Sequence, residues 1–236
     1  MSRRRSNRKK QNRQVQGRHL ITQLNPRSPI SEQYRTLRTN IEFSSIDEPI
    51  QTIVITSSIP GEGKSLTSAN LAIVYAQQGK KVLLVDADMR KPTVHYTFRL
   101  NNLQGLSNLL IQDDTIEASV SMSGIEHLDI MSSGPIPPNP SELLGSQRMK
   151  VFIEEAKKNY DIILFDTPPV NVVPDAQILA NIVDGTILVV RSGQTEIDEA
   201  KRAKETLETA NSKLLGAVIN DLDKKTSHGY HYYYAT

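Results

Sequence analysis

The sequence contains no cysteine. This absence excludes disulfides, thiolate zinc sites and iron–sulfur clusters, so any bound metal must use oxygen or imidazole ligands. Long hydrophobic runs are also missing: no stretch of about 18 apolar residues could cross a bilayer, and the basic N-terminus lacks the apolar segment of a signal peptide. We therefore expect a cytoplasmic protein.

Acidic residues are missing from residues 1–18, which contain six Arg and two Lys. This arm has only Met1 and Val15 to bury, so we expect it to be disordered. The whole chain carries +2, whereas outside the arm 20 basic residues face 26 acidic ones, a net charge of −6. The arm is either a solvated tail or a segment attracted to anionic lipid or a partner's acidic patch. Nucleic acid is not favoured as a partner, because the acidic body would repel phosphates.

The length of 236 residues fits one sizeable α/β domain with short tails, since single cores stop growing at roughly 250 to 300 residues. Hydrophobic residues make up 38% and charged residues 23%, which is typical of a globular domain. We assign residues 19–226 to this domain and residues 227–236 to a flexible, Tyr-rich tail.

A helix is predicted at about residues 28–43, where Ile30, Tyr34, Leu37 and Ile41 form one apolar stripe. A charged stripe lies beside it, consisting of Glu32, Arg35 and Arg38. This second stripe is either an exposed, ion-paired face or a subunit interface in which Arg pairs with a neighbour's carboxylate.

Short β-branched runs alternate with segments of helical length from residue 52 onward. This pattern is typical of a mainly parallel sheet covered by helices on both faces. The expected strands cover residues 52–56, 82–85, 128–131, 162–165, 186–190 and 214–219. The expected helices cover residues 64–78, 141–158, 176–182 and 196–210. Residues 135–140 are predicted to form a loop, with Ser141 as the N-cap of the next helix.

The clearest chemical signal is a strand that runs into Ser58-Ile-Pro-Gly-Glu-Gly-Lys-Ser65 and then into a helix. This is the context of a P-loop, in which backbone N–H groups and the helix N-terminus hold phosphates. Lys64 would reach the β- and γ-phosphate oxygens, and the Ser65 hydroxyl would meet Mg²⁺. Ser58 departs from the usual pattern, since it replaces the first Gly by another small residue. The predicted nucleotide site also includes Pro60, Gly61, Glu62, Gly63 and Leu66.

Carboxylates end two further predicted strands. Asp86 and Asp88 follow one strand with a single residue between them, so alternation along the chain sends both side chains to the same side. Asp166 ends another strand in the manner of a Walker B acid. A single Asp in such a place could simply begin a turn. Three acids and a P-loop at the edge where α/β sheets bind ligands instead indicate a metal and phosphate site.

With these motifs the chain resembles the bacterial tyrosine kinases of capsule and exopolysaccharide synthesis. The resemblance covers nearly the whole chain after the arm. Glu32–Arg38 is similar to the family's oligomerisation motif, and the other matches are Pro60–Ser65 to its Walker A motif, Asp86–Arg90 to its second Walker A-like motif and Asp166–Pro169 to its Walker B motif. Four of the eight tyrosines lie in the last seven residues, as in the family's autophosphorylated cluster: Tyr230, Tyr232, Tyr233 and Tyr234.

The resemblance implies a three-layer P-loop NTPase-like fold and an ATP- and Mg²⁺-dependent kinase that phosphorylates its own tail. Lys64 would stabilise the transferred phosphate, and the metal would be held by Ser65, Asp88 and Asp166. The three Asp residues would share the general-base role, for which we favour Asp86.

Two more residues are singled out by position. Arg90 would help to organise either phosphate or the tail. Asn220 ends the last predicted strand, where related nucleotide-binding folds place an adenine-reading Asn; an ordinary strand-ending Asn is an equal alternative.

The family also implies partners. These are further copies of the chain in a closed homo-oligomer such as a ring, tyrosine-containing protein substrates, and a separate transmembrane activator. The activator would complete the ATP site and recruit the chain to the inner face of the membrane.

A rival function is that of a partition or division-site ATPase, a nucleotide-controlled switch of the same broad fold without kinase activity. Those proteins have a signature Lys two residues before the Gly of the loop, where this chain has Ile59. They also lack a Tyr-rich end. The sequence therefore favours the kinase.

Overall fold

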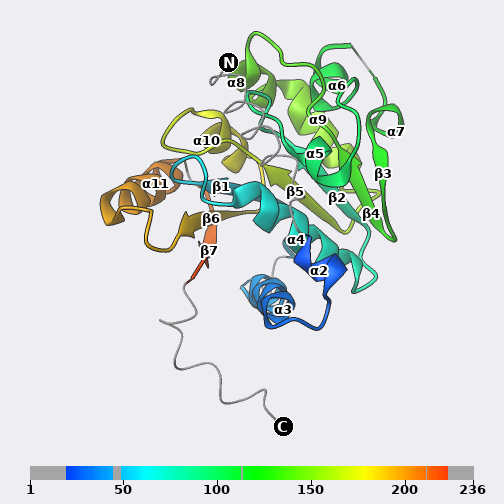
Figure 1. The fold of residues 1–236 in the computed structure, drawn as a ribbon. Coiled ribbons are helices and arrows are strands. Elements are labelled where there is room, and N and C mark those ends of the chain that lie inside the picture. Colours follow the sequence, from blue (N-terminus) through cyan, green and yellow to red (C-terminus); the bar gives the residue numbers. More distant parts are fainter. Residues whose placement is uncertain (1–19, 45–48, 113, 211, 223–236) are drawn as a thin grey trace, which may run out of the picture.

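The computed structural model describes residues 20–44, 49–112, 114–210 and 212–222. The predicted basic arm (1–18) and the predicted tail (227–236), with its four tyrosines, lie outside the described residues. The described part has a central sheet with helices on both sides (Figure 1), which confirms the predicted α/β architecture.

One seven-stranded sheet has the strand order β3-β4-β2-β5-β1-β6-β7. Its strands are β1 (Thr52–Ser57), β2 (Val82–Asp86), β3 (Ser121–Ile125), β4 (Leu128–Met131), β5 (Ile162–Asp166), β6 (Gly185–Arg191) and β7 (Leu214–Asn220). Neighbouring strands are parallel except for β3 and β4. All six predicted strands are confirmed. The antiparallel β3 was not predicted, because its sequence, Ser-Met-Ser-Gly-Ile, lacks a β-branched run and is held by pairing with β4.

The helices are α2 (Ile21–Leu24), α3 (Pro29–Phe43), α4 (Lys64–Ala76), α5 (Val94–Phe98), α6 (Leu106–Gln112), α7 (Ile116–Ser119), α8 (Pro140–Leu144), α9 (Gln147–Ala156), α10 (Asp175–Ala180) and α11 (Ile197–Thr209). The long predicted helices at 28–43, 64–78 and 196–210 are confirmed to within about two residues. The helices α2, α5, α6 and α7 were missed, since four to seven residues carry too little periodicity.

The single helix predicted at residues 141–158 is wrong, because two helices occupy this region. α8 begins at Pro140, whose fixed φ suits a first helical position, so Ser141 is not the N-cap. After Gly145, the hydroxyl of Ser146 accepts a hydrogen bond from the Met149 N–H at 3.2 Å and starts α9. Gly and a capping Ser side by side end one helix and begin the next.

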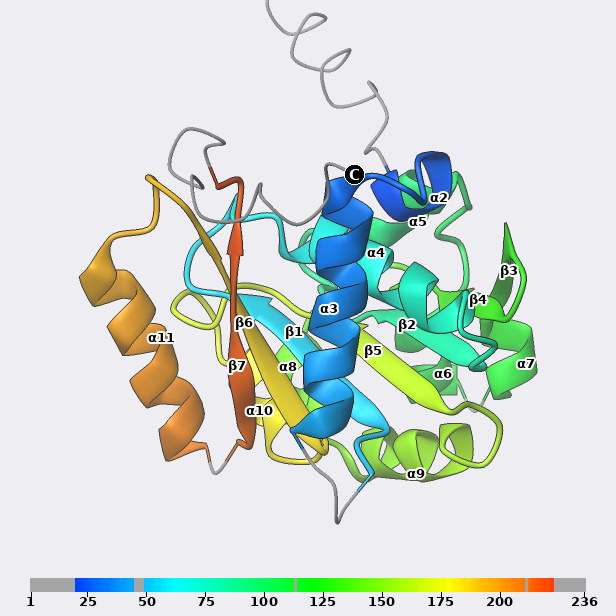
Figure 2. The ribbon, with the colours of Figure 1, turned by 90° about the horizontal axis from the view of Figure 1, so that it is seen from below.

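Alternate residues of the central strands face opposite layers. Ile53 and Ile55 of β1 pack with the buried face of α4, whereas Val54 packs in the cluster that contains α6 and α9. A third cluster joins α10 and α11 to β6. Figure 2 shows α3 running along the outside of the layer formed with α4, and β7 at the edge of the sheet.

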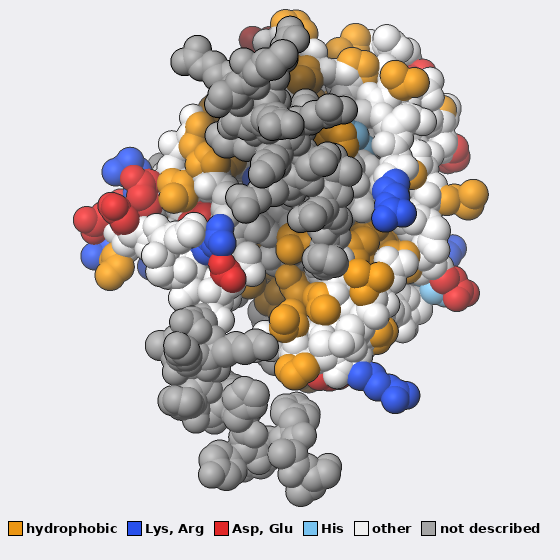
Figure 3. Space-filling model, in the orientation of Figure 1, with side chains coloured by type: hydrophobic (Ala, Val, Ile, Leu, Met, Phe, Trp, Pro, Cys, Tyr) orange, Lys and Arg blue, Asp and Glu red, His pale blue; other side chains and the backbone are white. Residues whose placement is uncertain are grey.

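The helix α3 is docked by part of the predicted apolar stripe. Ile41 is buried and Tyr34 and Leu37 pack on the core, whereas Ile30 is 47% exposed. Hydrophobic side chains show on the surface over α2 and α3 in Figure 3, and those most exposed there are Leu24 and Phe43.

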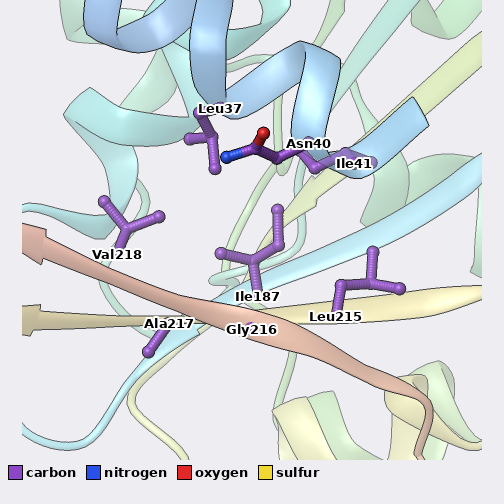
Figure 4. Close-up of a pocket in the computed structure, with 8 residues that line it drawn as sticks. All are labelled: Leu37, Asn40, Ile41, Ile187, Leu215, Gly216, Ala217 and Val218. Atoms are coloured by element: carbon purple, nitrogen blue, oxygen red, sulfur yellow. The ribbon is translucent and has the colours of Figure 1, made fainter. Parts of the chain in front are cut away.

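A small pocket of about 130 Å³ opens between α3 and β7 (Figure 4). Leu37, Asn40 and Ile41 approach it from α3, opposite Leu215 and Val218 of β7. None of its lining residues belongs to the P-loop or to the carboxylate-bearing strand ends. Within the described ranges, no helix combines the length and hydrophobicity needed to cross a bilayer.

Candidate active site

The P-loop joins β1 to α4 at the carboxyl-terminal edge of the sheet. Gly61 and Gly63 have φ angles of 92° and 93°, in the left-handed region that favours Gly. A Cβ at position 63 would also come within 2.0 Å of Asn220 Nδ2. The helix then begins at Lys64, so its free N–H groups lie at the end of the loop, where phosphate binds in this motif.

A buried carboxylate supports the loop from inside. Glu62 is 2% exposed and accepts hydrogen bonds from Ser58 Oγ at 3.1 Å and from the Ile59 N–H at 2.9 Å. It also accepts one from Thr195 Oγ1. Glu62 and Ser58 therefore brace the backbone that a phosphate would contact. Both lie inside the protein and not on its surface.

The other predicted P-loop residues lie nearer to solvent. Pro60 and Gly61 are exposed at the tip of the loop. Ser65 and Leu66 are half-buried in the first turn of α4.

The lysine and the predicted acids meet at this edge. Asp86 and Asp166 are directly paired residues at the ends of the adjacent strands β2 and β5. Lys64 Nζ lies 3.1 Å from Asp88 Oδ2, 3.3 Å from Asp166 Oδ1 and 3.3 Å from Ser65 Oγ. The structure therefore brings together the five residues that the sequence placed at the site's centre.

Asp86 is fully buried and organises the loop after β2. Its Oδ2 accepts the N–H groups of Thr93 and Val94, each at 2.9 Å, and its Oδ1 accepts the Asp88 N–H at 3.3 Å. A carboxylate has about four acceptor positions, so one remains. Asp88 in turn accepts the Lys91 N–H at 3.0 Å.

Burial sets the protonation of this cluster. Desolvation, reinforced by the charge of Asp166, raises the pKa of Asp86 to about 7. Desolvation also raises the pKa of Asp166, although Lys64 opposes the shift. Burial alone would lower the pKa of Lys64, but Asp166 and Asp88 raise it above its ordinary value. The lysine therefore stays charged at neutral pH.

The donor set fits a Mg²⁺ ion that is completed by other ligands. Asp166 Oδ2 is buried without a hydrogen-bond partner, which is costly for a carboxylate and is relieved by a cation. No group of three acidic, His or Cys side chains in the described part of the chain is arranged to hold a metal by itself. Mg²⁺ usually takes only one or two carboxylates and fills its shell with water and substrate phosphates. The residues that would hold it here are Ser65, Asp88 and Asp166.

Arg90 binds a carboxylate of the same chain, whereas the sequence analysis proposed that it organises phosphate or the tail. Its Nε and Nη2 donate to the two oxygens of buried Asp175, each at 2.9 Å. Ser141 Oγ joins both, accepting from Arg90 Nη2 at 2.9 Å and donating to Asp175 at 2.6 Å. Asp175 was not singled out from the sequence, since a single Asp at the start of a helix usually means a favourable helix terminus.

Asn220 lies against the outer side of the P-loop. Its Nδ2 donates to the Glu62 carbonyl at 2.9 Å, a contact within the chain, and adenine reading by Asn220 stays a prediction. Arg191, which the sequence analysis also missed, donates to the Gly61 carbonyl at 3.4 Å. Its only sequence signal was a position at the end of a buried strand.

The charged stripe of α3 has partners within the chain. Arg35 and Glu32 form an ion pair near the surface. Arg38 is 16% exposed and donates to the Val74 carbonyl of α4 at 2.9 Å. Arg38 therefore stabilises the packing of α3 on α4 within the chain.

Known proteins similar to this chain share both its sequence and its fold. A family model described as an AAA domain matches residues 50–215. The chain is 55% identical over 216 residues to the tyrosine-protein kinase YwqD of Bacillus subtilis (strain 168), covering 91% of each protein. It superposes with a TM-score of 0.84 on the kinase domain of the Escherichia coli tyrosine kinase ETK, at 34% identity and covering 92% of this chain and 86% of the other. The chimerical protein CapA2B2 also gives 0.84, at 48% identity and covering 87% and 90%.

Proposed function

Because this chain belongs to the bacterial tyrosine kinases, it is a tyrosine kinase, and we propose that it transfers the γ-phosphate of ATP to the tyrosines of its own C-terminal segment. The observation that carries this proposal is the contact of Lys64 with Asp88 and Asp166 beside the P-loop. A P-loop NTPase-like fold is a nucleotide-binding fold, and this cluster is where the terminal phosphate would be held.

Each residue has a part in the transfer. Backbone N–H groups of residues 61–65 hold the phosphates, and Lys64 neutralises charge on the transferred group. Mg²⁺, when bound with ATP by Ser65, Asp88 and Asp166, supplies further positive charge. The tyrosine oxygen attacks the γ-phosphorus, the bond to the β-phosphate oxygen breaks, and ADP leaves. Asp86 accepts the phenolic proton, since a pKa of about 7 suits a base at neutral pH and one acceptor position stays open.

The position of the C-terminal segment supports tail phosphorylation. β7 is parallel to β6, so it ends at the same edge as the P-loop, and Asn220 touches that loop. Tyr230 and Tyr234 follow residue 222 by 8 and 12 positions, which at about 3.3 Å per extended residue gives a reach of roughly 26 to 40 Å from the edge of the sheet. Tyr230, Tyr232, Tyr233 and Tyr234 are the proposed acceptors.

Partners are proposed on the same basis. The contact between copies in a closed homo-oligomer is formed by α3, including the partly exposed Glu32 and Arg35. A membrane-embedded activator recruits the chain to the inner face of the membrane, and the eight basic residues of 1–18 add attraction to anionic lipid. Tyrosine-containing proteins of capsule or exopolysaccharide synthesis are the external substrates. The division-site ATPase alternative is not favoured, given 55% identity to a tyrosine kinase.

The test is purified protein incubated with Mg-ATP, alone and with activator segments, and read by mass spectrometry. Lys64→Met is expected to abolish phosphotyrosine, and Lys80→Met, which alters an exposed lysine, should retain it. Undiminished phosphotyrosine in Lys64→Met would overturn the proposal. ATP hydrolysis without any phosphotyrosine would favour the ATPase switch.

A further inference from the structure

Residues at the ends of β6 and β7 form hydrogen bonds with the outer side of the P-loop. Thr195, in the loop after β6, donates to the buried carboxylate of Glu62 and accepts the Arg191 N–H at 2.8 Å. Asn220, the last residue of β7, donates to the Glu62 carbonyl at 2.9 Å. The Ser192 N–H donates to the Asn220 carbonyl at 2.9 Å, so the two strand ends are also joined to each other.

The contact between Asn220 and the P-loop leaves no spare room. A Cβ at Gly63 would lie 2.0 Å from Asn220 Nδ2 and 3.2 Å from its Cγ. Only Gly at position 63 therefore lets Asn220 pack directly on the loop and reach the Glu62 carbonyl. This close packing and the hydrogen bond link the end of β7 to the P-loop, so a movement of one segment is felt by the other.

Arg191 extends this unit to the residue after β7. Its Nε and Nη2 donate to Asp221 Oδ2 at 3.0 and 2.6 Å, while its Nη1 donates to the Gly61 carbonyl at 3.4 Å. One guanidinium thus contacts the tip of the P-loop and the start of the C-terminal segment at the same time. Asp221 has φ of 56°, so the chain turns at this residue as it leaves the sheet.

We infer that Arg191 and Asp221 are positioning residues that couple nucleotide binding at the P-loop to the placement of the C-terminal segment that carries the tyrosines. A nucleotide that fixes the loop favours the Arg191 position that also holds Asp221. By linkage, a segment held at Asp221 favours the nucleotide-binding form of the loop to the same extent. The inference rests on the proposed function, because it needs nucleotide at the P-loop.

The coupling depends on a weak contact, the ion pair between Arg191 and Asp221. Arg191 and Asp221 are 33% and 60% exposed, and exposed ion pairs contribute little to stability. Such a pair can open without unfolding the domain, whereas the Asn220 contact is half-buried and stays in place. Asp221 is therefore held by Arg191 when the pair is closed and released when it opens, and bound nucleotide shifts the balance between these two states.

Limited trypsin digestion measures this placement, because Lys224 and Lys225 lie just after Asp221. The full chain is digested with and without saturating Mg-ADP, which cannot phosphorylate the tail, and the loss of the C-terminal peptide is followed by intact mass. Binding of a fluorescent ADP analogue is titrated in parallel for every variant. The ratio of the cleavage rates with and without nucleotide cancels any effect of a substitution on the protease itself.

Mg-ADP is expected to slow wild-type cleavage by about two- to fivefold, the range that an exposed ion pair supports. Asp221→Asn and Arg191→Gln should bring the ratio close to one. The matched control is Lys204→Gln, which removes an exposed ion pair of α11 with Glu208 at 3.4 Å and should behave as wild type. A wild-type ratio of one despite measured ADP binding, or an unchanged ratio in both variants, overturns the coupling. Failure of the wild type to bind ADP overturns the proposed function itself, and the inference with it.

Discussion

Arg90 grips the buried carboxylate of Asp175 with two hydrogen bonds of 2.9 Å, and this pair joins the loop after β2 to the start of α10. The same loop carries Asp88, so the ion pair holds one of the proposed metal ligands in place. Asp175 is fully buried, whereas Arg90 is 38% exposed on its outer side.

Removing Arg90 should therefore destabilise the domain and weaken nucleotide binding together. We expect Arg90→Ala to lower the free energy of unfolding by roughly 2 to 3 kcal/mol, somewhat less than for fully buried pairs because Arg90 is partly solvated. Urea denaturation measures this loss. Arg90→Lys should retain only part of the stability that Arg90→Ala loses, since an ammonium group cannot form the bidentate contact with Asp175. An Arg90→Ala variant as stable as wild type, with weaker ATP binding alone, would instead assign Arg90 to the phosphates.

Asp86 and Asp166 should respond differently to replacement by Asn. An Asn at position 86 has one acceptor oxygen for three N–H groups, so at least one buried donor loses its partner, at a cost of about 1 to 3 kcal/mol. Phosphotyrosine should be lost in Asp86→Asn, with ADP affinity falling only as far as the loop loosens. Nearly unchanged ADP binding with no transfer supports the base role. An equal collapse of binding and transfer makes Asp86 a structural residue.

Asp166→Asn keeps one oxygen that can accept from Lys64 and Ser68, replaces the unpartnered oxygen by an NH₂ group and removes the negative charge. We expect it to bind ADP without Mg²⁺ at least as well as wild type, since one charge that repels phosphate is gone, and to lose the tightening that Mg²⁺ causes. Titrations of a fluorescent ADP analogue with Mg²⁺ and with EDTA measure both values. Retention of the full Mg²⁺ effect would remove Asp166 from the metal site.

The charged stripe of α3 separates into two roles. Arg38→Ala loses a charged hydrogen bond to the Val74 carbonyl, so we expect a fall in melting temperature of about 3 to 6 °C even in the monomer. The double variant Glu32→Ala and Arg35→Ala removes an outer ion pair and should shift the melting temperature by less than about 2 °C. Light scattering should show that this double variant no longer assembles. A wild type that stays monomeric at high concentration, with ATP and activator, argues for a merely exposed face.

Stability of the nucleotide-free protein should fall as pH rises from about 4 to about 7. The pKa of Asp86 is raised to about 7 in the fold, so between the unfolded value near 3.9 and about 7 the folded state binds more protons than the unfolded state. One such group gives a slope of at most about 1.4 kcal/mol per pH unit. Asp184 has the opposite effect on stability. Burial would raise its pKa, but hydrogen bonds from Thr52 lower it below the ordinary value, so Asp184 stabilises the fold when ionised and this stabilisation is lost as the pH falls into the acidic range. The pH dependence of the urea midpoint should become shallower in Asp86→Asn, where Asp166, whose pKa burial also raises, still contributes. A wild-type curve that is already flat contradicts the prediction.

The sequence by itself determined the parts of this protein that depend on local pattern. A β-branched run before Gly61-Glu-Gly-Lys-Ser65 predicts a strand, a loop and a helix in that order, because each element follows from the conformational preferences of its own residues. Asp86 and Asp166 were placed correctly at strand ends for the same reason, since parallel strands end at one edge.

Only the tertiary structure decided which partner each polar side chain has. Arg90 lies two residues from Asp88 but bonds to Asp175, which is 85 positions further along the chain, and Asn220 reaches Glu62 across 158 positions. Such pairings depend on where the strands lie in the sheet, and strand order is not encoded in any short segment. The strand β3 was missed for a related reason, because its pairing with β4 outweighed a weak local preference. The break between α8 and α9 has a local signal, Gly145 followed by the capping Ser146, which the prediction of one long helix overlooked. Burial also set the charge of the site, because the pKa of Asp86 reflects its removal from water beside Asp166, which no sequence pattern records.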